Sequence, residues 1–274
     1  MPPYVRGYQW ASLLLAWLGA SQWPALALWL DTRHDAALEP EFAAIYEAVA
    51  RRAFADALRR AQTLSRRIRL PQGKARALTS VADVALMDDQ PEVALDVLAA
   101  FPREWRLPAP LEVAVLVANG RAMEAVDSMR GRLEEKREPA VIRAFVTALV
   151  AAGQLDEALR VALGAPRDIE RPGMLAVETR LFRGERFEDC LRVASAAFES
   201  FGVPDDAYNA ACSCARLGRL DDAASWLSRA VEAGYADRAH LEADEDLAPL
   251  RGREDFDAMC AGVPRRDGAA PPED

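Results

Sequence analysis

The residues best suited to chemistry in this chain are four cysteines and two histidines among 274 residues. Cys212 and Cys214 form a pair with metal-like spacing, because one residue separates them. Residues two apart on a helix do not face each other, and no histidine lies close to the pair in the sequence. We therefore expect these thiols to pack as small apolar groups, and we predict that the chain needs no metal or other cofactor.

The sequence also lacks the motifs of the common enzyme classes. It has no Walker-type phosphate loop, no GxGxxG, no HExxH and no nucleophile elbow. His34 and His240 are expected to be solvent-exposed or to cap a helix. The acidic run Glu242 to Asp246 lacks EF-hand spacing and is expected to be a charged cap. These observations predict a protein that is not an enzyme and has no small-molecule substrate. An enzyme built on a helical scaffold is the distant alternative.

Composition limits both the fold and the partners. The chain is 51% apolar, only 7% aromatic, and rich in alanine, leucine, arginine and glutamate, which favour helices. Alternating patterns of the kind that mark strands are scarce, so we predict an all-α fold. The net charge of −9 would repel a phosphate backbone, and nucleic acid is therefore not an expected partner.

A short pattern recurs along the chain: a turn residue, then acidic and apolar positions, then a small residue. The turn positions are 52, 89, 120, 153, 184 and 218, separated by 37, 31, 33, 31 and 34 residues. A period near 34 with two helices per unit is typical of helical repeat proteins. The copies cover residues 51–58, 88–95, 119–126, 151–160, 183–192 and 217–224.

The chemistry of one unit explains why these residue types recur. A turn residue such as Gly153 ends the first helix in a left-handed conformation. Acidic residues such as Asp156 and Glu157 then begin the second helix, where they complement its dipole. A small residue follows, Ala158 in this copy and Cys190 in the fifth, and lets the two helices approach closely.

This pattern resembles the tetratricopeptide repeat family over roughly residues 38–235. The resemblance implies a right-handed α-solenoid of about six helix-turn-helix repeats, with prolines between units at Pro102, Pro139, Pro166 and Pro204. The helix that contains Pro108 and Pro110 is expected to be short. His240 to Phe256 resembles the closing segment of many bacterial arrays of this family, which predicts capping helices over residues 236–263. The Pro-rich and charged residues 264–274 are predicted to form a disordered tail.

The resemblance also implies a protein or peptide ligand in the concave groove. In this family the second, fifth, sixth, ninth and twelfth positions of a first helix tend to face the ligand. Asn209 follows Tyr208 in a sequence that resembles a common start of family repeats, where the amide often holds a peptide backbone. An alternative is that Asn209 only satisfies a neighbouring helix end. Transferred to this chain, the groove residues are Arg143, Thr147, Met174, Glu178, Tyr208, Asn209 and Cys212.

Residues 1–37 form a hydrophobic N-terminal segment and linker, with no charged residue between Gly7 and Leu30. About 20 apolar residues suffice for a helix to cross a bilayer, so residues 7–30 are predicted to be a single membrane span. A cleaved signal peptide and a helix packed on the repeats are the alternatives. The absence of a disulfide pattern favours the cytoplasmic side for the repeats.

Together these expectations describe a membrane-tethered binding module that scaffolds, assembles or regulates a membrane or envelope complex. The alternative is a non-catalytic regulatory companion or appendage of a membrane enzyme such as an intramembrane protease. Both are analogies at the level of the fold, because function depends on the site and not on the architecture.

Overall fold

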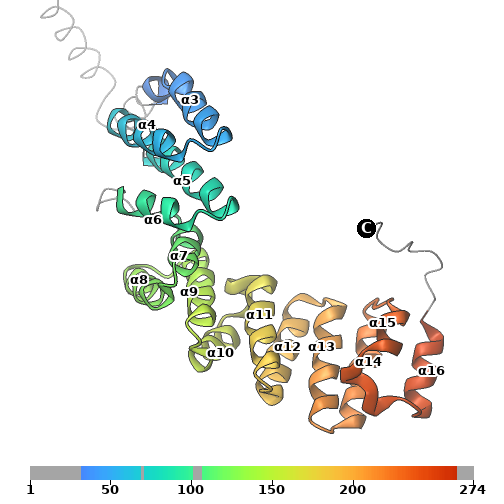
Figure 1. The fold of residues 1–274 in the computed structure, drawn as a ribbon. Helices are drawn as coiled ribbons and strands as arrows, with labels where there is room; N and C mark the ends of the chain where they lie inside the picture. The colour runs from blue at the N-terminus through green and yellow to red at the C-terminus, as the bar shows by residue number, and fades with distance from the viewer. Residues whose placement is uncertain (1–31, 69–70, 101–106, 264–274) are drawn as a thin grey trace, which may run out of the picture. The chain divides into compact units, whose positions relative to one another are not determined.

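The computed structural model describes residues 32–68, 71–100 and 107–263. Within these ranges the chain is helical and contains no strand, which confirms the predicted all-α class. Successive helices pack on one another, as Figure 1 shows, and this arrangement is compatible with a helical repeat. The predicted span at 7–30 and the predicted tail at 264–274 lie outside the described residues. Among the helices that are described, none is long and apolar enough to cross a membrane.

The chain divides into two compact units, Met1–Asn119 and Gly120–Asp274. The first contains α3 (Glu39–Ala50), α4 (Phe54–Arg67), α5 (Pro71–Met87), α6 (Pro91–Ala100) and α7 (Ala109–Ala118). The second contains α8 (Ala122–Glu135), α9 (Pro139–Ala151), α10 (Leu155–Gly164), α11 (Pro166–Arg183), α12 (Phe187–Phe201), α13 (Pro204–Arg216), α14 (Leu220–Glu232), α15 (Arg238–Ala243), the 3₁₀-helix η2 (Glu245–Leu250) and α16 (Glu254–Gly262).

Left-handed residues mark the turns at a nearly constant spacing. They are Arg52, Asp89, Gly120, Gly153, Glu185 and Gly218, with φ between 56° and 74°, and lie 37, 31, 33, 32 and 33 residues apart. Backbone hydrogen bonds close several of these turns in the same way, as from Gln154 N to Leu149 O at 2.9 Å and from Arg219 N to Cys214 O at 2.9 Å. Five of the six predicted turn positions are left-handed. In the remaining copy Gly184 has a φ of −88°, and Glu185 takes the left-handed conformation instead.

A small residue lies five positions after every one of these left-handed residues, and each is fully buried. Their exposed fraction is 0% for Ala57, Ala94, Ala125, Ala158, Cys190 and Ala223. The second helix of each copy therefore presents a short, fully buried side chain in its first turns. A longer side chain there would hold the neighbouring helices apart, because folded interiors are closely packed.

Proline sets the start of several helices. Pro110, Pro139, Pro166 and Pro204 each occupy one of the first two helical positions, where the missing N–H has no intrahelical partner to lose. The helix α7 is short, with 10 residues, as predicted from Pro108 and Pro110. The prolines lie at its beginning and do not interrupt it, since Pro108 is the residue before the first helical one.

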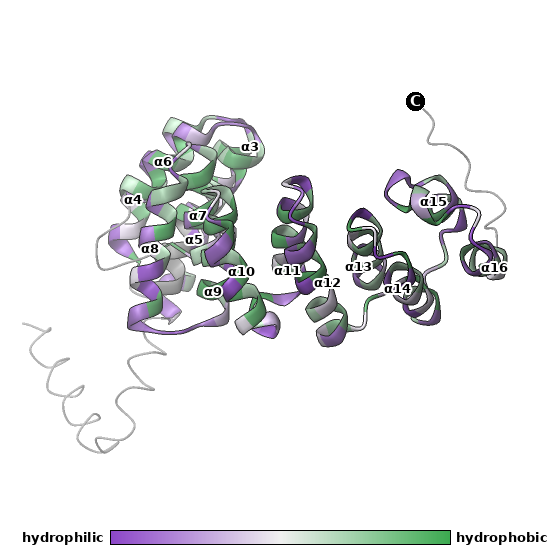
Figure 2. Ribbon diagram, turned by 90° about the horizontal axis from the view of Figure 1, so that it is seen from below, coloured by the Kyte–Doolittle hydropathy of each residue, from purple (hydrophilic) through white to green (hydrophobic). Residues whose placement is uncertain are grey.

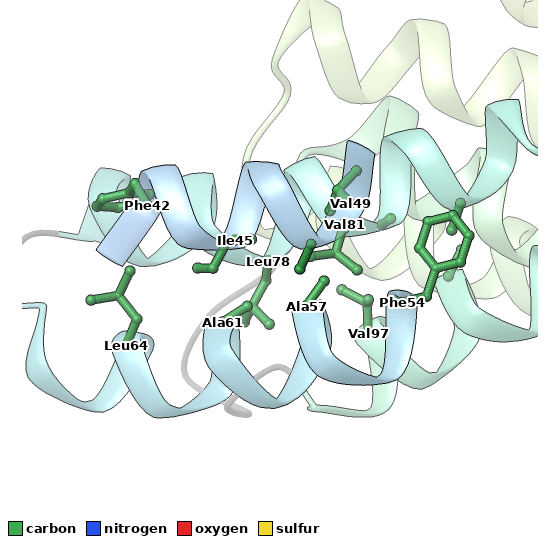
Figure 3. Packing of buried hydrophobic residues seen from close by; sticks show 14 of the residues in the cluster. Phe42, Ile45, Val49, Phe54, Ala57, Ala61, Leu64, Leu78, Val81 and Val97 are labelled. Carbon is green, nitrogen blue, oxygen red and sulfur yellow. The ribbon is translucent and has the colours of Figure 1, made fainter. Parts of the chain in front are cut away.

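Each unit has a hydrophobic core formed by the inward faces of its helices. In the first unit Phe42, Ile45, Leu64, Leu78 and Val81 interdigitate between α3, α4 and α5, as Figure 3 shows. In the second unit a cluster joins α13 and α14 to the closing segment through residues that include Leu227, Leu241, Leu247, Leu250 and Phe256. Most labelled helices carry both hydrophobic and hydrophilic residues in Figure 2, as amphipathic helices do.

The helix α11 is bent near its beginning. Glu170 has a φ of 58° and a ψ of 170° inside this segment, and Pro172 follows two residues later. Proline disfavours the helical conformation in the residues before it and removes a donor, so the bend has a local cause. The long part of α11 that carries Met174 to Arg183 begins after this bend.

Candidate functional site

A hollow of about 320 Å³ lies in the second unit, where α11 and α13 meet the closing segment of α15 and η2. The helices α11 and α13 and the closing segment from His240 onward all contribute lining residues. The lining combines apolar, aromatic and acidic side chains: Leu175, Glu178, Thr179, Phe182, Tyr208, Asn209, Cys212, His240, Asp244 and Asp246.

Tyr208 fixes the closing segment against α13. Its ring stacks on the ring of Tyr235, with centroids 4.7 Å apart and planes that differ by 1°, and its hydroxyl donates to Oδ2 of Asp244. The same oxygen receives the Cys212 thiol at 3.8 Å and lies 3.8 Å from Nε2 of His240. Burial raises the pKa of both the Tyr208 phenol and the Cys212 thiol, so each stays protonated and acts as a donor.

Glu178 is the most unusual group in the hollow. Its exposed fraction is only 3%, and its Oε2 atom has no hydrogen-bond partner. Burial, together with the nearby charge of Asp206, raises its carboxyl pKa to about 8, while a hydrogen bond from the Asn209 amide and the charge of Arg171 act in the opposite direction. A buried polar atom without a partner costs about 1–3 kcal/mol, so the site holds an acceptor that is not yet used.

The nearby arginines are already paired with other carboxylates. Arg171 donates from Nε to both carboxylate oxygens of Asp206, at 3.0 and 3.1 Å, and Asp206 is itself buried. Arg216 donates to Asp246 at 2.7 Å, and its guanidinium lies 4.5 Å from the centre of the Phe187 ring. Neither arginine donates a hydrogen bond to Glu178 Oε2, and the lining of the hollow includes acidic residues but no lysine or arginine.

Four of the seven residues expected in the groove line this hollow together: Glu178, Tyr208, Asn209 and Cys212. The other three lie elsewhere. Arg143 and Thr147 are on α9, where Arg143 pairs with Glu170 at 2.6 Å and the Thr147 hydroxyl donates to the Arg143 carbonyl at 3.1 Å. Met174 is fully buried, and the neighbouring Leu175 lines the hollow in its place.

Sequence reasoning missed the contribution of the closing segment. His240, Asp244 and Asp246 were expected only to be exposed or to form a charged cap, yet they form one side of the hollow. Each faces a helix about 30 residues earlier in the chain, as the pairing of Arg216 with Asp246 shows. The repeat period carries the signal that could have found them, because the residues one period after α13 fall in α15 and η2.

The four thiols are free and buried, and their pKa values are raised by burial, to about 12 for Cys190 and about 11 for Cys214. Thiols of this kind are poor nucleophiles. In the ranges that the structure describes, no group of three or more histidine, cysteine, aspartate or glutamate side chains is arranged to hold a metal ion. Cys212 bonds to Asp244, and Cys214 packs in the core.

A second hollow of about 340 Å³ lies between α3 and α4 in the first unit. Its charged residues are paired within it: Arg59 and Arg60 with Asp56, at 2.6 and 2.7 Å, and Arg67 with Glu41 at 2.9 Å. Each charged side chain of this hollow takes part in one of these ion pairs, and we do not regard the hollow as the functional site.

Comparison of the chain with protein-family models and with curated proteins found no match.

Proposed function

We propose that this chain is a non-enzymatic binding module of the tetratricopeptide type, whose first helices hold an extended segment of a partner protein. The left-handed turns that recur every 31 to 37 residues support about six repeats. The buried small residue five positions after each turn supports the same register. In a right-handed solenoid of such repeats, the first helices α9, α11 and α13 would line the inner surface.

The hollow over α11 and α13 is the observation that carries the proposal. Four residues that the family register assigns to the ligand face lie together there, although they come from helices 30 residues apart. Asn209 forms a hydrogen bond with Glu178 and lines the hollow. An amide can donate and accept at once, so it can hold an extended chain of any sequence.

Membrane tethering is the second part of the proposal. It rests on the sequence, since residues 7–30 contain no charged residue and are long enough to span a bilayer. A tether would raise the concentration of the module near membrane-bound partners without any new contact. The module would then serve in the assembly or regulation of a membrane complex.

Photo-crosslinking from within the hollow tests the binding function. A photoreactive amino acid replaces Thr179, an exposed residue of the lining, and in a second sample it replaces Glu199, an exposed residue of α12 outside the hollow. We expect a partner segment to be captured from position 179 in native membranes and not from position 199. A synthetic peptide of that segment should then bind the full-length chain.

The variant Asn209→Ala should weaken binding of that peptide at least tenfold. Gln90→Ala is the matched control, because it removes an exposed amide from the first unit. Equal crosslinking from positions 179 and 199, or unchanged peptide affinity in Asn209→Ala, would remove the hollow as the binding site.

A further inference from the structure

Glu178 presents a buried acceptor that the folded chain leaves unused. Of the buried side-chain nitrogen and oxygen atoms in the described ranges, only its Oε2 lacks a hydrogen-bond partner. The carboxyl group lines the hollow, and the Asn209 amide holds it from the α13 side. A ligand that donates a hydrogen bond here would satisfy an atom whose burial is otherwise unfavourable.

The surroundings of Glu178 favour a positively charged donor. Asp244 and Asp246 line the same hollow, and the only lining side chain able to carry positive charge is His240, whose ring nitrogen lies beside Asp244. Arg171 and Arg216 are committed to Asp206 and Asp246. Asp246 is thus matched by Arg216, whereas Glu178 lies in the lining without a direct ion pair.

The apolar lining selects among cations. The rings of Phe182 and Tyr208 and the side chain of Leu175 border the hollow, so a ligand must fit flat apolar surfaces as well as carboxylates. A guanidinium group is planar, stacks on aromatic rings and is weakly hydrated, whereas an ammonium group is compact and strongly hydrated. The guanidinium also offers several N–H donors in a fork that matches a carboxylate.

We propose that the hollow between α11, α13 and the closing segment binds an arginine side chain of the partner, with Glu178 as its carboxylate acceptor. This inference rests on the proposed binding function and names the chemistry that the site recognises. The arginine of the ligand enters beside Leu175 and Thr179, and its guanidinium pairs with the carboxyl group of Glu178. The peptide backbone next to it lies on the Asn209 side.

Binding of this kind releases a proton. The raised pKa of Glu178, about 8, keeps the carboxyl group protonated in the empty hollow at neutral pH. The guanidinium keeps its charge, and it favours the ionised carboxylate, so the proton of Glu178 passes to solvent. The affinity should therefore rise roughly tenfold per pH unit below about pH 8 and level off above it. The charged or titratable groups near Glu178 or in the same hollow include Arg171, Cys190, Asp206, Tyr208, Cys212, His240, Asp244 and Asp246.

Titration of the full-length chain with a small arginine probe tests the inference by nuclear magnetic resonance. The probe is N-acetyl-arginine methylamide, and the comparison compound is the citrulline analogue, which has nearly the same shape but no charge. We expect the arginine probe to shift the amide signals of Thr179, Asn209 and His240 with a millimolar dissociation constant. The citrulline compound should bind at least tenfold more weakly.

The variant Glu178→Gln keeps the shape of the side chain and removes its charge. It should lose at least tenfold in affinity for the arginine probe and should lose the steep dependence on pH, which separates Glu178 from His240. Glu199→Gln makes the same change at an exposed site on α12 and should bind the probe as the wild-type chain does.

Equal binding of the arginine and citrulline compounds to the wild-type chain would overturn the inference, as would the absence of shifts at the hollow. Neither result would contradict the proposed binding function, which is tested by crosslinking from position 179. A crosslinked partner segment without arginine at the hollow would leave the function standing and refute the arginine site. Arginine-selective binding without any crosslinked partner would support the arginine site and refute the proposed binding function.

Discussion

Glu178 makes the stability of the second unit depend on pH. Its carboxyl pKa is about 8 in the folded chain, against an ordinary value of 4.5. Between these values the folded state holds a proton that the unfolded state has lost, so stability falls as pH rises, by up to about 1.4 kcal/mol per pH unit. The stability that comes from the proton held by Glu178 is fully present below pH 4.5, and it is lost above pH 8.

The variant Glu178→Gln should remove this dependence. We expect it to gain stability relative to the wild-type chain between pH 5.5 and pH 8, because a neutral amide loses nothing when the solution becomes basic. Urea unfolding followed by circular dichroism at pH 5.5, 7 and 8.5 measures the difference, with Glu199→Gln as the control for the loss of one carboxylate. A difference that stays constant across this range would contradict a raised pKa at Glu178.

The Tyr208 hydroxyl should contribute to holding the closing segment. Tyr208→Phe removes its hydrogen bond to Asp244 and keeps the stack on Tyr235. We expect a loss of about 1.5–3 kcal/mol, the usual range for a hydrogen bond to a charged group. Thermal unfolding measures it, and Tyr235→Phe is the comparison, because it keeps the same stack and leaves the hydrogen bond between Tyr208 and Asp244 intact. Equal stability of Tyr208→Phe and the wild-type chain would show that the hydrogen bond is not made in solution.

At the scale of single residues, the sequence could predict several of the side chains that line the hollow, but not all of them. Asn209 and Glu178 were assigned from the repeat register, and both line the hollow. Met174 was assigned from the same register but is fully buried, and the neighbouring Leu175 lines the hollow instead. The register fixes the face of a helix, but packing against other helices decides which side chains of that face stay open.

Between helices, the small residue after each turn should set the closeness of packing. Ala158 is fully buried at the start of α10, and Ala158→Leu would push this helix away from its neighbours. We expect a loss of about 1–3 kcal/mol, the usual cost of overpacking a core. Ala151→Leu, at the exposed end of α9, should change stability by less than about 0.5 kcal/mol. Equal effects of the two substitutions in urea unfolding would argue against close packing at Ala158.

The turn between α5 and α6 should be improved by glycine. Asp89 has a φ of 56°, a conformation that costs a non-glycine residue about 1–2 kcal/mol. Asp89→Gly should therefore stabilise the chain by about 0.5–1 kcal/mol, after the greater freedom of glycine in the unfolded chain is counted. The reverse change, Gly153→Ala, should destabilise the chain, since Gly153 has a φ of 74°. Differential scanning calorimetry of both variants measures the two shifts, and shifts of the same sign would contradict this account.

The turns illustrate what the sequence predicts well at the scale of elements. Arg52, Asp89, Gly120, Gly153 and Gly218 were placed correctly because a turn residue and a small residue stand five positions apart in each copy. In the fifth copy the predicted turn position was wrong by one residue, because Gly184 was taken as the left-handed residue. Counting five positions back from Cys190 gives Glu185, the residue that is left-handed in the structure. The spacing is therefore a stronger signal than the glycine itself.

At the scale of the molecule, each of the two units contains a hydrophobic cluster of its own. One cluster includes Ile45, Ala61 and Leu78, and the other includes Leu227, Leu241 and Leu250. The sequence predicted repeats of similar composition, but not this division, since it depends on which helices make contacts far apart in the chain. The contribution of α15 and η2 to the hollow was missed for the same reason: it arises from packing against α13.

The separate cores predict that the units open independently. Leu227→Ala and Ile45→Ala each remove a fully buried side chain and should cost about 2–5 kcal/mol within their own unit. In helical repeats each element is stabilised mainly by its neighbours, so the cost should not spread along the chain. Hydrogen exchange of the full-length chain, read by mass spectrometry, should show faster exchange over residues 204–262 in Leu227→Ala. In Ile45→Ala the acceleration should be confined to residues 39–97. Acceleration of both regions by either substitution would mean that the chain unfolds as one cooperative body, and the two units would then be a division of contacts without a division of stability.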